Sequence, residues 1–268
     1  QAPFKISKYE QDSIVSMVDS SNDNADRMMQ RLYENNVLVV DLRDEIHMDE
    51  TLYHQNAFYN TDHHWTTNAS FWAHTKTIKF LVENTNVPVW NHTLTTDKSN
   101  YVVQVYPDSF LGSQGRRVGR FYGGVDDFEL ITPSFETDYE IEIVSHREDI
   151  IVKQGDFEES ILDRSLLDGS SIATNRYATY FGGDYPLVKI KNKLNPTGKL
   201  LILQDSFGLP FSSFMSLNFA ETQIIDLRHQ ANFDLARYLD DQMFDAVIML
   251  YNPSVYREDT MELFNKNI

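Results

Sequence analysis

Residues 200–251 alternate between short apolar runs and segments of mixed polarity, and this alternation limits the fold more strongly than any other feature. The apolar runs have strand length, the segments after them can form helices, and the pairs are 200–203 with 209–219, 223–227 with 232–240, and 246–251 with a segment that starts near Pro253. Strand–helix units of this length favour a parallel sheet with helices on its faces. We therefore predict an α/β fold with a mostly parallel central sheet.

The amino-terminal part of the chain continues this pattern. A continuous apolar run at 37–42 predicts another buried strand, adjacent to the three above. Residues 8–36 include apolar positions at helical spacing, and a helix is expected from Asn68 to about Glu83. Between about 86 and 195, short β-like runs predict a β-rich elaboration. We expect a single domain over residues 1–268 that contains this elaboration.

One glycine-rich stretch inside the elaboration carries several cations. Residues 112–124 contain five glycines together with Arg116, Arg117 and Arg120. Glycine and cationic side chains can cradle a phosphate, but this stretch lacks the strand–GxxxxGK[ST]–helix context of a phosphate-binding loop. We therefore expect a flexible loop or hairpin here.

Composition excludes some classes of function. The formal net charge of −17 disfavours nucleic acids and anionic lipid as partners. The chain has no cysteine, which rules out disulfides and thiolate metal sites. No stretch approaches the roughly 18 apolar residues of a membrane span. Because residue 1 is Gln and not an initiator Met, the chain is expected to be a trimmed product, and any signal peptide or anchor would lie upstream.

The segment LLILQDSFG, which ends in a strand-to-helix turn, contains a candidate nucleophile. Ser206 follows the apolar run and precedes the helical segment, so it is expected at the edge of the sheet. Backbone N–H groups at such a helix start can stabilise an oxyanion. The alternative is that Ser206 or Asp205 is simply an N-cap.

A second polar motif, YNTDHHW, supplies the groups that a serine nucleophile needs. A serine hydroxyl requires a base within hydrogen-bond reach, and the base requires an orienting group. Asp62 and His64 are two positions apart before the helix, so the carboxylate can bond to one imidazole nitrogen while the other faces outward. A metal site is the competing interpretation of Asp62, His63 and His64. It is disfavoured because neighbouring side chains on an extended loop point to opposite sides.

Taken together, TDHHWT with a following helix, then LQDSFGLPF, IIDLRH and AVIMLYN, resemble the DHHW family, which is related to the alginate O-acetylation proteins. The similarity covers about residues 37–85 and 185–255 and is loose between them. It implies an SGNH-hydrolase-like domain in which the Asp/His block precedes the serine block, the reverse of ordinary SGNH hydrolases. Gln204 stands where the SGNH serine block usually has glycine.

The resemblance implies a role for each matching residue. Ser206 would be the nucleophile, His64 the base and Asp62 its orienting group. The residues expected at the edge of the site, where they would bind substrate, are Arg228, Trp65 and His63. The candidate oxyanion donors are the N–H of Ser206, Gly183 and Asn192.

The activity implied by the resemblance is O-acetyl transfer, through a serine acyl-enzyme, onto a cell-surface or extracellular polysaccharide. The expected partners are the polysaccharide acceptor and a membrane acyltransferase that supplies the acetyl group; no nucleic acid, cofactor or metal is expected. The expected location is extracytoplasmic, secreted or membrane-anchored. Two alternatives stay open: a carbohydrate esterase with the same triad, and a non-catalytic glycan-binding protein whose aromatic residues stack on sugars.

Overall fold

The computed structural model describes residues 1–5, 21–48, 52, 56–169, 171–230 and 233–252. Its strands are β1 (Tyr101–Phe110), β2 (Asp126–Pro133), β3 (Tyr139–Val144), β4 (Ile150–Gly155), β5 (Leu187–Asn192), β6 (Lys199–Gln204), β7 (Glu221–Ile225) and β8 (Ala246–Leu250). Its α-helices are α1 (Ser21–Glu34), α2 (Leu42–Met48), α3 (Thr67–Asn84), α4 (His92–Thr95), α5 (Ser113–Val118), α6 (Arg120–Gly123), α7 (Phe157–Ile161), α8 (Ser165–Asp168), α9 (Leu209–Met215) and α10 (Leu235–Gln242). The helix expected near Pro253, and the residues before 21 that were expected to be helical, lie largely outside the described residues.

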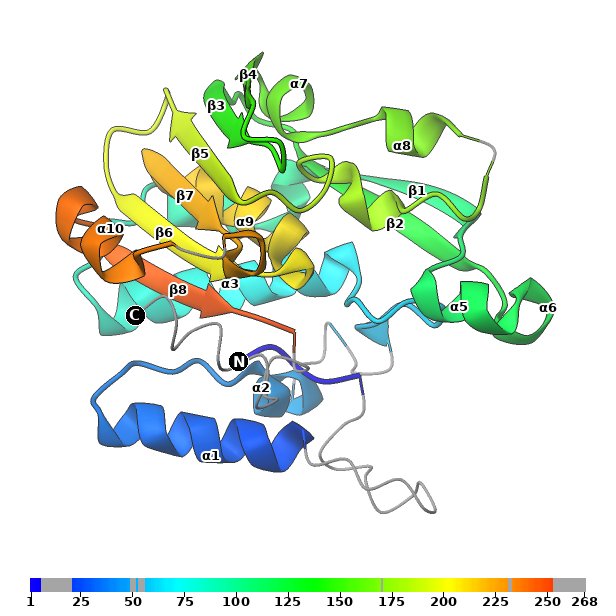
Figure 1. Cartoon of the computed structure of the whole chain (residues 1–268), viewed down its shortest axis with the longest axis horizontal. Coiled ribbons are helices and arrows are strands. Elements are labelled where there is room, and N and C mark those ends of the chain that lie inside the picture. Colours follow the sequence, from blue (N-terminus) through cyan, green and yellow to red (C-terminus); the bar gives the residue numbers. More distant parts are fainter. Residues whose placement is uncertain (6–20, 49–51, 53–55, 170, 231–232, 253–268) are drawn as a thin grey trace.

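The main sheet has six strands in the order β4-β3-β5-β7-β6-β8, and a separate hairpin joins β1 to β2 (Figure 1). β6 runs parallel to β7 and β8, whereas β3, β4 and β5 pair antiparallel. The fold is therefore α/β as predicted, but the sheet is mixed and the expectation of a mostly parallel sheet is wrong. The reason is that strands of the β-rich segment extend the main sheet. A short turn between β3 and β4 fixes that pair as antiparallel.

The apolar run at 37–42 is not a strand. Residues 37–41 make no ladder, Val37 and Leu38 are exposed, and α2 begins at Leu42. The Arg43 N–H donates to Asp41 Oδ1 at 3.1 Å, as in the first turn of a helix. Residues 37–41 are thus an extended segment that leads into α2, because Asp41, at the polar end of the run, initiates that helix.

Helices cover both faces of the sheet. Apolar side chains of β6 at Leu200 and Ile202 share a buried cluster with α3 and α9, whereas Leu201 and Leu203 pack with α10. α3 and α9 make close contact with each other (Figure 1). None of the described helices is long and apolar enough to cross a membrane.

The register of the sheet brings several loops to one edge. Because β6 and β7 are parallel, the carboxyl ends of both lie at the same edge, where Leu203 pairs with Ile225. β5 runs the opposite way, with Leu187 opposite Ile225, so its amino-terminal end lies there too. Segments 181–186, 205–208 and 226–229 therefore meet at this edge.

Candidate active site

Ser206 lies two residues after the end of β6, at the first residue of a short 3-10 turn, Ser206–Gly208, that leads into α9. Asp205 is the cap of this turn. Its Oδ1 accepts from the Phe207 N–H and its Oδ2 from the Asn252 N–H, both at 3.0 Å. The capping role therefore belongs to Asp205, which leaves the Ser206 hydroxyl available for another partner.

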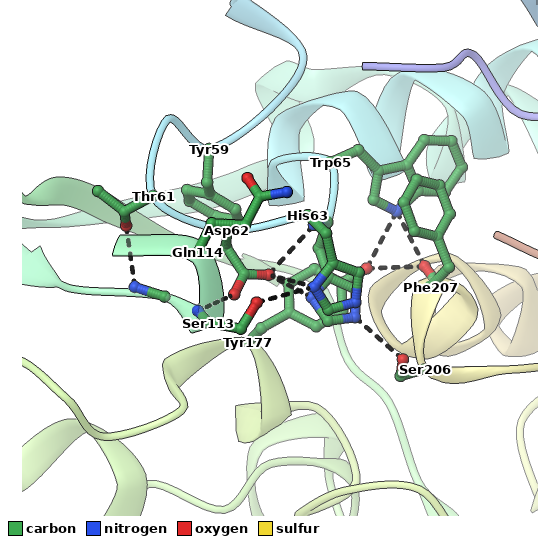
Figure 2. Close-up of polar contacts among 12 residues, drawn as sticks. Tyr59, Thr61, Asp62, His63, Trp65, Ser113, Gln114, Tyr177, Ser206 and Phe207 are labelled. Carbon is green, nitrogen blue, oxygen red and sulfur yellow. Dashed lines mark hydrogen bonds and ion pairs between the residues drawn. The ribbon is translucent and has the colours of Figure 1, made fainter. Parts of the chain in front are cut away.

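The predicted chain of hydrogen bonds from Asp62 through His64 to Ser206 is present (Figure 2). The distance between His64 Nε2 and Ser206 Oγ is 3.0 Å, and that between His64 Nδ1 and Asp62 Oδ1 is 2.5 Å. An ionised carboxylate can only accept hydrogen bonds, so His64 carries its proton on Nδ1. Nε2 is then an acceptor for the Ser206 hydroxyl, which is the arrangement that general-base activation requires.

The environment of this chain keeps Asp62 ionised. Asp62 and His64 are buried, whereas Ser206 is partly exposed, so a substrate can approach the hydroxyl. Burial alone would raise the pKa of the Asp62 carboxyl. The hydrogen bond and charge of His64, with the backbone N–H of Ser113, outweigh burial and hold that pKa far below its usual range.

The loop that carries Asp62 is fixed by groups from the β1–β2 hairpin region. Asp126, at the start of β2, accepts from the N–H groups of Asn60 and Thr61 at 2.8 and 2.7 Å. The Ser113 N–H, at the start of α5, donates to Asp62 Oδ2 at 2.6 Å. Both carboxylate oxygens of Asp62 are therefore held, one by His64 and one by α5.

Lys5 holds the same loop from the amino-terminal segment. Its ammonium group donates to the carbonyl oxygens of Tyr59 and Asp62, both at 2.6 Å, and to Gln114 Oε1 at 2.8 Å. Burial lowers the pKa of Lys5, and the charges of Asp126 and Asp62 oppose that shift. Nothing in the sequence pattern indicated this contact, because it joins segments that are more than fifty positions apart.

Gly112 allows the hairpin to approach Asp62 closely. A Cβ at this position would lie 2.3 Å from the Asp62 Cβ and 2.4 Å from its Oδ2. The Gly112 N–H also donates to Thr61 Oγ1 at 2.9 Å. The glycine-rich stretch around it connects the two strands of the β1–β2 hairpin, so a hairpin is present as expected, but the connection forms the short helices α5 and α6.

Trp65 is a core residue, so its expected role in lining a substrate groove is wrong. Its side chain is 0% exposed, and the indole N–H is directed at Phe207 O (2.9 Å) and Tyr177 Oη (3.0 Å). The Tyr177 hydroxyl also donates to Phe207 O, at 2.7 Å, and its ring stacks on that of His64 with centroids 4.0 Å apart. Tyr177 therefore supports the base, a role that no sequence signal revealed.

His63 and Arg228 lie at different edges of the site. The His63 side chain is 43% exposed; its Nδ1 lies 3.1 Å from Ser113 Oγ, and its ring centroid is 3.8 Å from that of His64. Arg228 pairs with Asp226 at 2.6 Å and with Asp184 at 3.2 Å. Burial would lower the pKa of Arg228, but its bonds to Asp226 raise it.

Asn192 and Gly183, the two candidate oxyanion donors outside the turn of Ser206, lie at different ends of the sheet. Asn192 is at the far end of β5, where its backbone N–H donates to the carbonyl of Ala220, just before β7, and its side-chain amide donates to Ser216 O at 3.3 Å. Five residues of strand, about 17 Å, separate it from the edge where Ser206 lies, so Asn192 is not an oxyanion donor. Gly183 is at the correct edge and lines a small cavity together with Gln204 and Asp205.

Two groups of described residues have the spacing of metal ligands. The first is Asp62, His63 and His64. The rings of His63 and His64 lie side by side, contrary to the expectation that neighbouring side chains point to opposite sides. In this group both nitrogens of His64 are already directed at protein groups, which favours proton transfer over metal binding. The second is Asp184, Asp226 and His229, where Arg228 already pairs with both carboxylates.

Comparison with known proteins places the fold. No protein-family model and no curated sequence matches the chain. Among solved structures, PatB1 from Bacillus cereus with a sulfonyl adduct superposes with a TM-score of 0.77 at 18% identity, over 97% of this chain and 81% of that one. A second PatB1 structure has a TM-score of 0.73 at 18% identity, with coverages of 96% and 82%. A DHHW family protein from Eubacterium siraeum has a TM-score of 0.68 at 20% identity, with coverages of 98% and 80%.

At these identities the likeness establishes the fold. The chain has the α/β fold that PatB1 and this DHHW family protein share, over nearly its whole length. The resemblance found in the sequence motifs is thereby supported by structural neighbours that include a protein of the named family.

Proposed function

We propose that the chain is an SGNH-hydrolase-like O-acetyltransferase that moves an acetyl group through Ser206 onto a cell-surface or extracellular polysaccharide. The observation that carries this proposal is the chain of hydrogen bonds from Asp62 through His64 to Ser206. This arrangement converts a weakly nucleophilic hydroxyl into an acyl acceptor. A sulfonyl adduct is present in one PatB1 structure, and sulfonyl reagents react with activated nucleophiles, which is consistent with nucleophilic chemistry on this fold.

The first half of the reaction would load the serine. Ser206 Oγ attacks the carbonyl carbon of an acetyl donor, and His64 Nε2 takes the hydroxyl proton. The imidazolium that forms is stabilised by Asp62, which also keeps the proton on Nδ1. Collapse of the tetrahedral intermediate breaks the bond to the donor's leaving group, which receives the proton from His64.

The oxyanion would be held by backbone N–H groups. Among the described residues, the N–H groups of Ser206 and Gly183 donate to no protein acceptor, so both remain available. In well-studied serine enzymes, one such donor is worth about 3–4 kcal/mol of transition-state stabilisation.

The second half would transfer the acetyl group. A sugar hydroxyl gives its proton to His64 and attacks the acetyl carbon, and Ser206 Oγ leaves with its proton restored. His63 and Arg228, at the rim, are the proposed substrate-binding residues, since each presents a partly exposed polar group beside the buried His64 or the sheet edge. The proposed setting is extracytoplasmic, with a membrane acyltransferase as the source of the acetyl group.

Intact-mass spectrometry after incubation with p-nitrophenyl acetate tests the acyl-enzyme. We expect one added acetyl group, mapped to Ser206 by peptide analysis, and no adduct in Ser206→Ala. Ser165→Ala is the matched control, because Ser165 also begins a short helix but bonds only to Asp163 in its own turn. Acetylation of Ser206→Ala at the wild-type rate would refute the role of Ser206.

Product analysis separates transfer from hydrolysis. With a soluble oligosaccharide present, a transferase yields acetylated sugar in proportion to the acceptor concentration, whereas an esterase yields only free acetate. A glycan-binding protein without catalysis would show neither product and no acyl-enzyme.

A further inference from the structure

We propose that the surface formed by α5 and α6 docks on an anionic phospholipid membrane. This α5–α6 surface consists of Arg116, Arg117, Val118, Arg120, Phe121 and Tyr122. The inference does not depend on acyl transfer, because it concerns where the protein sits and not what Ser206 does.

The first observation is an unusual exposure of large aromatic groups. Phe121 is 95% exposed and Tyr122 is 87% exposed, and Val118 beside them is also exposed. Exposed apolar side chains are ordinary when scattered, but a contiguous group that is rimmed by cations indicates an interaction site. Figure 1 shows α5 and α6 as a projection at the end of the molecule opposite α10.

The second observation is charge. The chain carries 40 acidic and 23 basic side chains, yet residues 111–125 contain three arginines and no acidic residue. Within the described residues, none of the guanidinium groups of Arg116, Arg117 and Arg120 pairs with a carboxylate, whereas Arg43, Arg164 and Arg228 are each paired. Arg116 donates one hydrogen bond, at 3.4 Å, to the Ala173 carbonyl. Three exposed cations that are close in sequence and pair with no carboxylate are complementary to a surface of phosphates.

The third observation is shape. The aromatic side chains stand on a projecting pair of short helices, and Arg120 lies over the Phe121 ring at 5.0 Å. A convex apolar tip can enter the headgroup region of a bilayer while arginines stay at the level of the phosphates. A polysaccharide or a folded protein would be met better by a groove or a flat face.

The negative charge of the whole protein does not prevent this contact. At physiological ionic strength the Debye length is about 8 Å, so charges on the far side of the molecule are screened from the membrane. Each arginine near an anionic surface is worth about five-fold in binding. The three arginines together can therefore outweigh the residual repulsion.

The α5–α6 surface lies close to the candidate active site, so a membrane bound there would be near Ser206 and its partners. The Ser113 N–H, at the start of α5, holds Asp62 Oδ2 at 2.6 Å, and the Gly115 N–H donates to Thr61 O at 2.7 Å. α5 is thereby fixed to the loop that carries Asp62 and His64. A membrane bound by α5 and α6 would lie beside the rim of the site, where a membrane donor could reach it.

Vesicle flotation tests the proposal. The protein is mixed at about 0.15 M salt with vesicles of phosphatidylcholine that contain phosphatidylglycerol, or with phosphatidylcholine alone. We expect up to about 10²-fold stronger binding to the anionic vesicles, the product of the three arginine contributions. Arg116→Gln, Arg117→Gln and Arg120→Gln together should remove that preference, with a loss of about five-fold for each arginine.

Phe121→Ser with Tyr122→Ser should weaken binding to both kinds of vesicle. Because these side chains are exposed, the variants should fold, and circular dichroism checks this. Met243→Ser and Arg147→Gln, which alter an exposed apolar and an exposed cationic residue elsewhere, are the controls and should bind like the wild type.

Several outcomes would overturn the proposal. They are wild-type protein that binds neither vesicle, variants that bind as well as the wild type, and self-association through Phe121 without vesicle binding, which would assign the surface to a second copy of the chain. Ser206→Ala should bind vesicles normally. A failure of acyl transfer therefore leaves the docking result intact, and the reverse also holds.

Discussion

Replacing Gly112 by Ala should strongly lower the rate of the reaction, because the new methyl group would collide with Asp62. The new methyl group would lie 2.3 Å from the Asp62 Cβ, whereas an ordinary contact begins near 3.4 Å. Asp62 or the hairpin must therefore retreat by about 1 Å. A displacement of about 1 Å in a catalytic group can cost about 10²-fold in rate. Gly112 has an ordinary φ of −70°, so backbone strain does not contribute.

The assay compares kcat for p-nitrophenyl acetate with the thermal midpoint of each variant. We expect about 10²-fold lower kcat in Gly112→Ala and a destabilisation of about 1–3 kcal/mol from overpacking. Gly123→Ala is the matched control, since its Cβ would meet nothing closer than 3.4 Å. Wild-type kcat in Gly112→Ala would show that the position of Asp62 beside the hairpin is irrelevant to the reaction.

Three further results are expected. Asp62→Asn should keep the fold, measured by circular dichroism, and lower kcat by roughly 10⁴-fold, as the corresponding change does in a well-studied serine protease; a loss below ten-fold would contradict the role of Asp62. Tyr177→Phe should lose the bond to Phe207 O and about 1 kcal/mol of stability, measured by urea unfolding, while kcat stays near wild type because the ring on His64 is kept. Burial lowers the pKa of the His74 imidazole to about 4. As the pH falls below about 6.5, the unfolded chain therefore takes up a proton on His74 before the folded chain does, and the free energy of unfolding should drop by up to about 3 kcal/mol by pH 4. His74→Leu should flatten this dependence in urea unfolding, and an unchanged slope would refute the assignment.

The three residues of the proposed triad could be predicted because the chemistry leaves a local pattern. Asp62 and His64 are close in sequence, and Ser206 follows an apolar run at a strand-to-helix turn. The supporting residues left no such pattern. Tyr177 and Lys5 reach the site through packing between distant segments, and neither lies in a motif that distinguishes it from an ordinary core or surface residue.

The errors in the fold have a common cause. An apolar run shows that side chains are buried but not which strand is the neighbour. The β-like runs between about 86 and 195 were therefore expected in an elaboration, whereas β3, β4 and β5 of that segment extend the main sheet. Periodicity also fails to separate a strand from an extended approach to a helix, as at 37–42. A comparable ambiguity led to the wrong prediction that Trp65 lines a groove, because aromatic side chains occur both in cores and in sugar-binding sites.

The prediction of the site does not depend on these parts of the fold, because the site consists of two local units and one hydrogen bond that joins them. Asp62 and His64 form the first unit, since Asp62 Oδ1 accepts both the imidazole Nδ1–H and, at 3.1 Å, the backbone N–H of His64. Ser206 belongs to the second, which β6 and the cap of its turn position at the sheet edge. The Trp65 indole, next in sequence to His64, joins them by its 2.9 Å bond to the carbonyl of Phe207, next in sequence to Ser206. The geometry of the triad therefore depends on this buried hydrogen bond more than on the order of strands elsewhere in the sheet.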